Sequence, residues 1–227
     1  MKAVVFAAGV LAFASAAFAQ GQPPPVAATG QVAPITVPWN TAIPAGTAEH
    51  ATRRLAESPR HGEWANIKLK DGTNLKSWVV YPERAEKTAV ILVIFDINGM
   101  RDLARALGDQ LAADGFIAIV PDFLSGKGPN GGGSESFTGG VGQGIQQLTP
   151  QDVNDRLDAA MAYGKDMPAS NGKTGVVGFC WGGARSFAYA AHQPNLNAAV
   201  VFYGEAPGSN TNTATEDSVA EIGSAHV

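Results

Sequence analysis

The sequence contains a single cysteine, Cys180, among its 227 residues. One thiol allows no internal disulfide, and the four scattered histidines do not have the ligand spacing of a zinc site. We therefore expect no metal and no organic cofactor. Cysteine is also a small apolar residue that is often buried for packing alone, so a structural role for Cys180 is the alternative to a chemical one.

Positive charge is scarce as well, with 16 Lys and Arg against 20 Asp and Glu and a formal net charge of −4. No segment carries a basic stripe, which argues against nucleic acid or an anionic lipid surface as a partner. No Walker-type phosphate loop is present. The sequence "GGVGQG" at 139–144 follows a loop instead of a strand, so a dinucleotide site is not predicted.

Long apolar runs are absent except at the start of the chain. Residues 1–19 combine Lys2, a short apolar stretch and Ala17-Phe18-Ala19, which is typical of a secretory signal peptide with an A-x-A cleavage site before Gln20. The apolar stretch is shorter than the roughly 20 residues of a membrane anchor. We predict an exported protein, periplasmic or secreted, with no membrane attachment after cleavage. In that compartment a free thiol is a liability, which favours a chemical role for Cys180.

Residues 20–59 are predicted to be a leader rich in Pro and Ala. The stretch 20–48 carries no charge and offers little to bury. Trp39 and Ile43 are the residues in it that could dock on a folded domain, and the sequence leaves this open. The folded domain is predicted to occupy residues 60–227.

From residue 60 onward, strands and helices alternate. A hairpin is predicted to turn at Asp71-Gly72. Continuous apolar runs predict buried strands at 88–96, 116–122, 173–179 and 197–204, and apolar periodicity predicts helices at 100–115, 149–167 and 182–194. This order predicts an α/β fold with a mainly parallel sheet and helices on both faces. The Gly-rich stretch 125–144 is predicted to be a surface loop, either a mobile excursion or a lid over substrate.

Cys180 follows the predicted strand 173–179 directly, where open α/β sheets place their ligand sites. The sequence "GFCWG" matches a nucleophile elbow with Cys in place of Ser. Gly178 and Gly182, two positions on either side, relieve the crowding of the strained turn. The helix N-terminus lowers the pKa of a thiol, and the N–H of Trp181 is expected to point to where an oxyanion forms.

The chain resembles the dienelactone hydrolase family of α/β-hydrolases from about Arg60 to Gly204. The resemblance is carried by "GFCWGG" together with "VIFDINGMRDLARALGDQLAADGFIAIVPDFLSG". It implies an α/β-hydrolase fold and a small ester or lactone as substrate. Phe95 and Asn98 depart from the family's commoner pattern "H-E-x-F/R-G", so the substrate itself is not predicted.

The resemblance also implies roles for individual residues. Cys180 aligns with the family nucleophile, and Ile97 with the residue whose N–H joins that of Trp181 in the oxyanion hole. Asp96 takes the place of an acidic residue, usually Glu, that contacts the resting thiol. Tyr203 aligns with an aromatic residue of the pocket wall, although a core tyrosine at a strand end is an equal alternative.

Other polar residues are weaker candidates. Asp122 is predicted to fix a loop, and Arg185 to form an ion pair instead of binding a substrate carboxylate. His50, His61 and His192 lie before the elbow or at the far end of a helix, so none is predicted to be the catalytic base.

The acid and the base of the catalytic triad are not evident in the sequence. An α/β-hydrolase supplies nucleophile, acid and base in that order, and the resemblance puts the last two much farther along than residues 181–227 allow. We interpret the chain as truncated at its C-terminus, without its last strands and inactive as it stands. The sheet is then expected to end at the strand 197–204. A rearranged pair of Asp217 and His226 is the alternative.

The function favoured by the sequence is hydrolysis of an ester or lactone through a thioester on Cys180. A non-catalytic, hydrolase-like binding protein is the alternative from another class. A thiol-dependent redox role is a third hypothesis, which no C-x-x-C motif supports. The sequence does not predict an oligomeric state.

Overall fold

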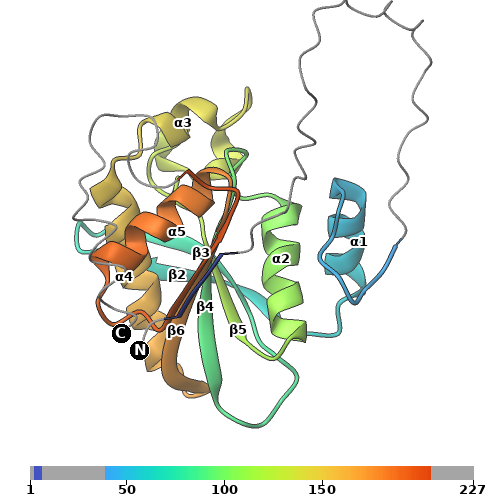
Figure 1. The fold of residues 1–227 in the computed structure, drawn as a ribbon. Coiled ribbons are helices and arrows are strands. Elements are labelled where there is room, and N and C mark those ends of the chain that lie inside the picture. Colours follow the sequence, from blue (N-terminus) through green and yellow to red (C-terminus); the bar gives the residue numbers. More distant parts are fainter. Residues whose placement is uncertain (1–2, 7–38, 206–227) are drawn as a thin grey trace, which may run out of the picture.

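A seven-stranded sheet forms the centre of the fold (Figure 1). In this computed structural model, which describes residues 3–6 and 39–205, the strands lie side by side in the order β1-β7-β6-β4-β5-β3-β2. Their bounds are β1 Ala3–Phe6, β2 Gly62–Lys68, β3 Asn74–Val80, β4 Thr88–Ile94, β5 Ile117–Pro121, β6 Ser170–Phe179 and β7 Ala198–Phe202. Strand β3 runs antiparallel to β2 and β5, and the other neighbours are parallel. The predicted mainly parallel sheet is confirmed.

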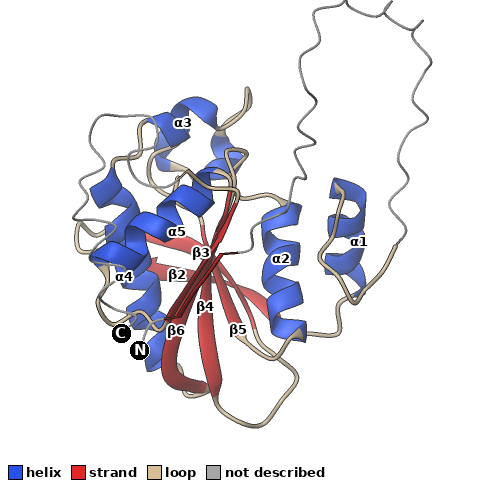
Figure 2. Cartoon of the chain, in the orientation of Figure 1, coloured by secondary structure: helices blue, strands red, loops and turns tan. Residues whose placement is uncertain are grey.

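Helices cover both faces of this sheet, as predicted (Figure 2). Their bounds are α1 Ala48–Glu57, α2 Asp102–Ala113, α3 Gly142–Gln146, α4 Pro150–Asp166 and α5 Trp181–His192. Helices α4 and α5 lie on one face and α2 on the other, with α1 packed outside α2. In the described ranges, no helix is both long and apolar enough to cross a membrane.

The central strands are continuous apolar runs because both of their faces are covered. All five residues of β5 are buried, and so are Val90, Leu92, Val93 and Ile94 of β4. The hairpin of β2 and β3 turns where predicted, with Gly72 at φ 86°, a conformation that glycine adopts without strain. The apolar runs and the turn residues in the sequence therefore predicted these buried strands and this hairpin.

Helix α4 is capped by Thr149, the first residue of the predicted helix 149–167. The Thr149 hydroxyl accepts a hydrogen bond from the N–H of Asp152 at 3.1 Å, and the Asp152 carboxylate accepts one from the Thr149 N–H at 3.0 Å. This reciprocal capping box satisfies two backbone groups that a helix start otherwise leaves unpaired. The apolar residues of the buried face are Val153, Leu157, Ala160, Met161 and Gly164.

Helix α1 lies within the stretch that the sequence analysis assigned to an extended leader, and it was not predicted. The Thr47 hydroxyl caps it by accepting a hydrogen bond from the N–H of His50 at 3.1 Å. Arg54 of this helix is buried, and the Trp39 ring contacts the His50 ring with centroids 5.3 Å apart. The packed part of the described chain therefore already includes Trp39, whereas the folded domain was predicted to start at residue 60. The sequence analysis did not predict this packing because composition does not show that Arg54 is buried.

The expectation that the sheet ends at β7 is wrong. Strand β1 pairs with β7 in parallel, in a register that runs from Ala3 opposite Ala198 to Phe6 opposite Val201. The outer edge of a strand presents unpaired N–H and C=O groups, which readily take up another apolar strand. Residues 3–6, "AVVF", are such a segment, and they belong to the predicted signal peptide.

Candidate active site

Cys180 lies on a sharp turn between β6 and α5, where it is the N-cap residue of the helix. Its backbone has φ 56° and ψ −119°, a region that costs a non-glycine residue about 1–3 kcal/mol. The Cys180 N–H donates to the carbonyl of Phe202 at 3.1 Å, and its carbonyl accepts from the N–H of Ala184 at 3.2 Å. The strained strand-to-helix turn predicted from the sequence is present.

The glycines around Cys180 are required by close backbone contacts. A Cβ on Gly178 would lie 2.0 Å from the carbonyl oxygen of Gly182, and one on Gly182 would lie 2.4 Å from that of Ile94. Sequence reasoning missed two further glycines. A Cβ on Gly183 would lie 2.7 Å from the Phe202 oxygen, and one on Gly204 would lie 2.3 Å from the Ala184 nitrogen. Their neighbours belong to different elements, so local spacing could not have identified them.

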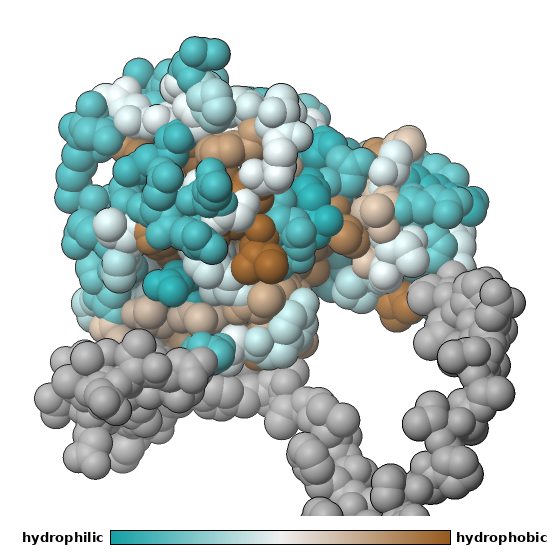
Figure 3. Space-filling view, turned by 90° about the horizontal axis from the view of Figure 1, so that it is seen from above, coloured by the Kyte–Doolittle hydropathy of each residue, from teal (hydrophilic) through white to brown (hydrophobic). Residues whose placement is uncertain are grey.

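The two predicted oxyanion donors start from neighbouring elements. Ile97 follows β4, and Trp181 is the first residue of α5, which packs against the end of β4 through Gly182. Within residues 39–205, neither the Ile97 N–H nor the Trp181 N–H donates a hydrogen bond. Both donors are therefore available to a ligand. Figure 3 looks down on this end of the sheet and shows apolar residues near the middle of the face, ringed by hydrophilic ones.

The Trp181 side chain is held by aromatic rings and a cation. It stacks on Phe95 with ring centroids 6.0 Å apart, and the ring of Phe123 meets it edge-on at 6.0 Å. The Arg185 guanidinium lies over the indole at 5.6 Å. Burial lowers the pKa of Arg185, and the side chain forms no ion pair within residues 39–205. The ion pair predicted for Arg185 is wrong, because Arg185 packs over the Trp181 ring instead.

Asp96 is tied to its own loop. Its carboxylate accepts hydrogen bonds from the backbone N–H of Asn98 at 2.9 Å, from the Asn98 amide at 2.9 Å and from Arg101 at 3.2 Å. The resemblance implies a contact between Asp96 and the resting thiol. In the described part of the chain, the carboxylate instead braces the turn that carries the Ile97 N–H.

Tyr203 lies at the rim of the site. Its side chain contacts Phe179 with ring centroids 6.3 Å apart, and the residue is 74% exposed, so the alternative of a core tyrosine is wrong. Desolvation raises the pKa of the Tyr203 hydroxyl, and the charges of Asp96 and Cys180 raise it further. Those charges act on Tyr203 because the three residues lie close together at the ends of β4, β6 and β7.

Asp122 fixes a loop, as predicted. Its buried carboxylate accepts hydrogen bonds from the N–H of Ser134 at 2.7 Å and from the Ser134 hydroxyl at 2.6 Å. The same hydroxyl accepts a hydrogen bond from the N–H of Met100 at 3.2 Å. Ser134 thereby joins the Gly-rich loop to the loop that carries Ile97. Burial raises the pKa of the Asp122 carboxyl, and the hydrogen bonds from Ser134 oppose this rise.

The histidines within the described residues lie away from the elbow. His50 lies on α1 against Trp39, His61 stacks on Tyr81, and the Nε2 of His192 lies 3.2 Å from Asp158. None of them contacts the thiol. Asp217 and His226, the alternative acid and base, lie outside the described residues. Within residues 3–6 and 39–205, no group of three or more His, Cys, Asp or Glu is placed to hold a metal ion.

Comparison with known proteins identifies the family. Residues 75–224 match the sequence model of the dienelactone hydrolase family. The chain belongs to this family. The resemblance derived from the elbow and the strand-helix-strand segment is confirmed.

Relatives in the dienelactone hydrolase family are moderately similar. A carboxymethylenebutenolidase homolog from Xenopus tropicalis is 33% identical over 58% of this chain and 52% of its own length. The carboxymethylenebutenolidase of Pseudomonas putida is 29% identical over 63% and 61%. The first curated relatives are matched over 50%, 61% and 52% of their own length, so the chain spans little more than half of them.

A solved dienelactone hydrolase has the same fold. The enzyme from Anabaena variabilis superposes with a TM-score of 0.50 at 19% identity, covering 64% of each chain. At this identity the likeness supports the α/β-hydrolase fold alone, which confirms the predicted fold class.

Proposed function

We propose that this chain supplies the nucleophile and the oxyanion donors of a carboxylic ester or lactone hydrolase. The Cys180 thiolate attacks the carbonyl carbon, and the N–H groups of Ile97 and Trp181 stabilise the negative oxygen of the tetrahedral intermediate. The C–O bond to the alcohol then breaks, and the alkoxide takes a proton from water. A thioester on Cys180 remains, and water hydrolyses it to release the acid and restore the thiol.

The observation that carries this proposal is the backbone of Cys180. A cysteine selected only for packing has no reason to occupy φ 56° at the first turn of a helix. Such a position projects the sulfur from the sheet and puts it at the N-terminus of α5. The two unengaged N–H groups next to it support an acyl-transfer role over a redox role.

Release of the thioester requires a base that activates water. The sequence analysis offered His226, with Asp217 as its acid, only as an alternative to residues beyond Val227. Acylation of Cys180 does not depend on either interpretation, so it tests the nucleophile separately from turnover. We further propose that the protein is exported through residues 1–19 and that the mature chain begins at Gln20, which N-terminal sequencing of exported protein tests.

Intact-mass spectrometry after incubation with p-nitrophenyl acetate tests the acylation step. We expect one acetyl group on the wild-type chain, removed by neutral hydroxylamine because it is a thioester, and none on Cys180→Ser under the same conditions. The Ser variant also serves as a fold control, with an unchanged circular dichroism spectrum. An acetyl group that survives hydroxylamine, or one equally present on the variant, would overturn the proposal and favour the binding-protein alternative.

A further inference from the structure

A cavity of about 180 Å³ lies next to the elbow, and its lining includes the neighbours of Cys180 and Ile97 but neither of these residues. Phe179, the residue before Cys180, and Asp96, the residue before Ile97, both line it. Val93 contributes from β4, Phe95 from the residue that follows this strand, and Leu103 and Leu107 from α2. The walls are mostly apolar, and the charged groups are Asp96 and Arg101, which pair with each other at 3.2 Å. The cavity therefore suits an uncharged, apolar group.

The remaining wall comes from a distant part of the sequence. Pro44 and Ala45, in the turn that precedes α1, also line the cavity. The family match begins at residue 75, so these residues lie outside the part shared with the family. We propose that the cavity holds the acyl group of the ester and that the turn at Pro44 and Ala45 forms the wall that limits its size. This inference rests on the proposed function, which it deepens by naming the substrate class.

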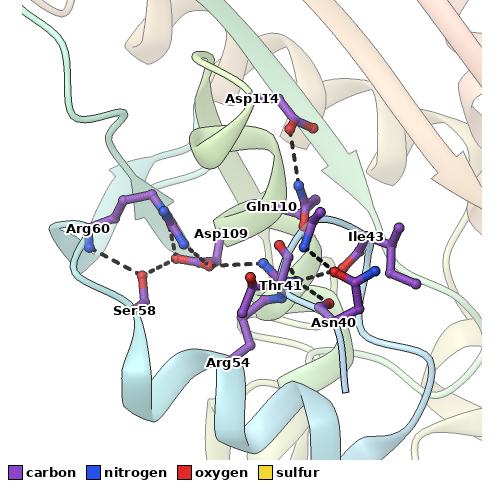
Figure 4. A network of polar contacts seen from close by, with 10 residues as sticks. Asn40, Thr41, Ile43, Arg54, Ser58, Arg60, Asp109, Gln110 and Asp114 are labelled. Atoms are coloured by element: carbon purple, nitrogen blue, oxygen red, sulfur yellow. Dashed lines mark hydrogen bonds and ion pairs between the residues drawn. The ribbon is translucent and has the colours of Figure 1, made fainter. Parts of the chain in front are cut away.

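Arg54 holds the wall in place. Its side chain is 3% exposed, and its guanidinium donates to the backbone carbonyls of Thr41 at 3.1 Å and Ile43 at 2.6 Å, with a longer contact to Asn40 at 3.5 Å (Figure 4). One buried side chain of α1 thus fixes the turn just before Pro44. These hydrogen bonds come from Nη2 and tie the turn to the helix, whereas the buried Nε of Arg54 has no hydrogen-bond partner among the described residues.

The helix itself is anchored to α2 through Asp109. This buried carboxylate lies 3.8 Å from the Arg54 guanidinium and accepts two hydrogen bonds from Arg60, at 2.9 Å and 2.7 Å (Figure 4). It also accepts one from the Ser58 hydroxyl. Asp109 therefore fixes both α1 and the chain that follows it. The wall is a built part of the fold, and not a frayed end.

The volume indicates which acyl groups fit. An apolar cavity of about 150 Å³ is known to hold a benzene molecule. A cavity of about 180 Å³ therefore has room for one six-membered ring or an acyl chain of about six carbons. We expect Pro44 and Ala45 to limit the length of an acyl chain that enters on their side of the cavity. The inferred substrate class is thus an ester of a short aliphatic or monocyclic aromatic acid.

Two variants test the wall, with a matched control. Ala45→Leu adds volume to a half-buried lining position and should shorten the longest acyl group accepted. Arg54→Ala releases the turn and should lengthen it. Arg53→Ala is the control, because Arg53 also contacts the Trp39 ring but otherwise forms only an exposed pair with Glu57.

The measurement is the acylation rate of Cys180 with p-nitrophenyl acetate, hexanoate and decanoate. For wild type and Arg53→Ala we expect hexanoate to react at least about tenfold faster than decanoate. Ala45→Leu should lower the ratio of hexanoate to acetate by about tenfold, and Arg54→Ala should raise the ratio of decanoate to hexanoate by a similar factor. Identical ratios in wild type and Ala45→Leu would overturn the inference.

A binding measurement separates this inference from the proposed function. Saturation-transfer NMR with hexanamide, which cannot acylate a thiol, should show binding to wild type that is lost in Ala45→Leu. If acetate fails to acylate Cys180 while hexanamide binds in this way, the proposed function is wrong and the cavity stands. If acetate acylates Cys180 but hexanamide does not bind, the wall inference is wrong and the nucleophile stands.

Discussion

Two glycine-rich segments of this protein use glycine for different reasons. In the elbow, a Cβ on Gly178 or Gly182 would lie within 2.4 Å of a backbone oxygen. In the loop after β5, a Cβ on Gly132 or Gly133 would lie 2.6 Å or 2.3 Å from a side-chain atom, whereas one on Gly139 or Gly140 would meet nothing within 4 Å. The elbow therefore depends on the absence of side chains. A run of glycines in the sequence does not show whether close packing requires them. Only the atoms that surround each glycine in the structure distinguish the two cases.

The loop is positioned by side chains instead. Asp122 at the end of β5 holds Ser134 by two hydrogen bonds, and Ser134 in turn receives the N–H of Met100. One segment is thus fixed by close backbone packing and the other by a buried polar anchor. The two respond to different substitutions, which makes the comparison testable.

The largest effect is expected for Gly178→Ala. Its Cβ would lie 2.0 Å from the oxygen of Gly182, and backbone on both sides must move to admit it. We expect a loss of about 3 kcal/mol or more in the free energy of unfolding, measured by urea denaturation. A loss below about 1 kcal/mol would show that the elbow adjusts easily, and the comparison would then fail.

The next largest effect is expected for Asp122→Ala. The substitution leaves the buried N–H and hydroxyl of Ser134 without their acceptor, which costs about 2–3 kcal/mol. Urea denaturation measures the stability, and limited proteolysis reports whether the loop is released. Ser136→Ala, which removes one hydrogen bond to the Gly133 carbonyl inside the same loop, is the control. Equal protease resistance in both variants would contradict the anchor.

A smaller effect concerns acid and the start of α4. Partial burial alone would raise the pKa of Asp152, but hydrogen bonds from Lys127 and Thr149 lower it to about 2. The carboxylate therefore stabilises the fold above its unfolded pKa of about 3.9, and this contribution is lost as the pH falls through about 2.

Asp152→Asn should cost about 1 kcal/mol at pH 7 and flatten the fall in stability between about pH 4 and pH 2. Thermal melts across that range measure the slope. Asp155→Asn, which affects only a side-chain bond to Gln151, should keep the wild-type slope. A steep slope retained in Asp152→Asn would assign the acid sensitivity to other carboxylates.

The smallest effect is expected for Gly139→Ala, the counterpart of Gly178→Ala. Because its Cβ would meet nothing within 4 Å, stability should change by no more than about 0.5 kcal/mol. A thermal melt suffices. A loss of stability comparable to that of Gly178→Ala would mean that Gly139 is also required for close packing.

The part of the fold that the sequence predicted is local in origin. The buried strands β4 to β7, the helices α2, α4 and α5 and the turn at Cys180 each leave their pattern within about ten residues and were predicted to within a few residues, whereas β1, α1 and α3 were not predicted. Helix α1 was missed because Arg54 is stabilised by carbonyls 11–14 residues away and by Asp109 on another helix. A buried arginine looks like a surface arginine until its partners are known.

The features of the candidate site also divide into those that the local sequence predicted and those that depend on distant partners. The elbow and its flanking glycines were predicted, whereas the bracing of Asp96 by Arg101 and the stacking of Arg185 on Trp181 were not. Both depend on side-chain directions that spacing does not set. The link from Ser134 to Met100 joins residues 34 apart, and no motif connects them.

The backbone of Cys180 has a consequence for engineering. Glycine adopts φ 56° and ψ −119° more readily than any residue with a side chain, so Cys180→Gly relieves strain where the proposed chemistry takes place. A library selected for heat resistance alone will therefore enrich variants that have lost the proposed nucleophile. Directed evolution of this protein has to select for thiol reactivity in every round, because survival at high temperature rewards its loss.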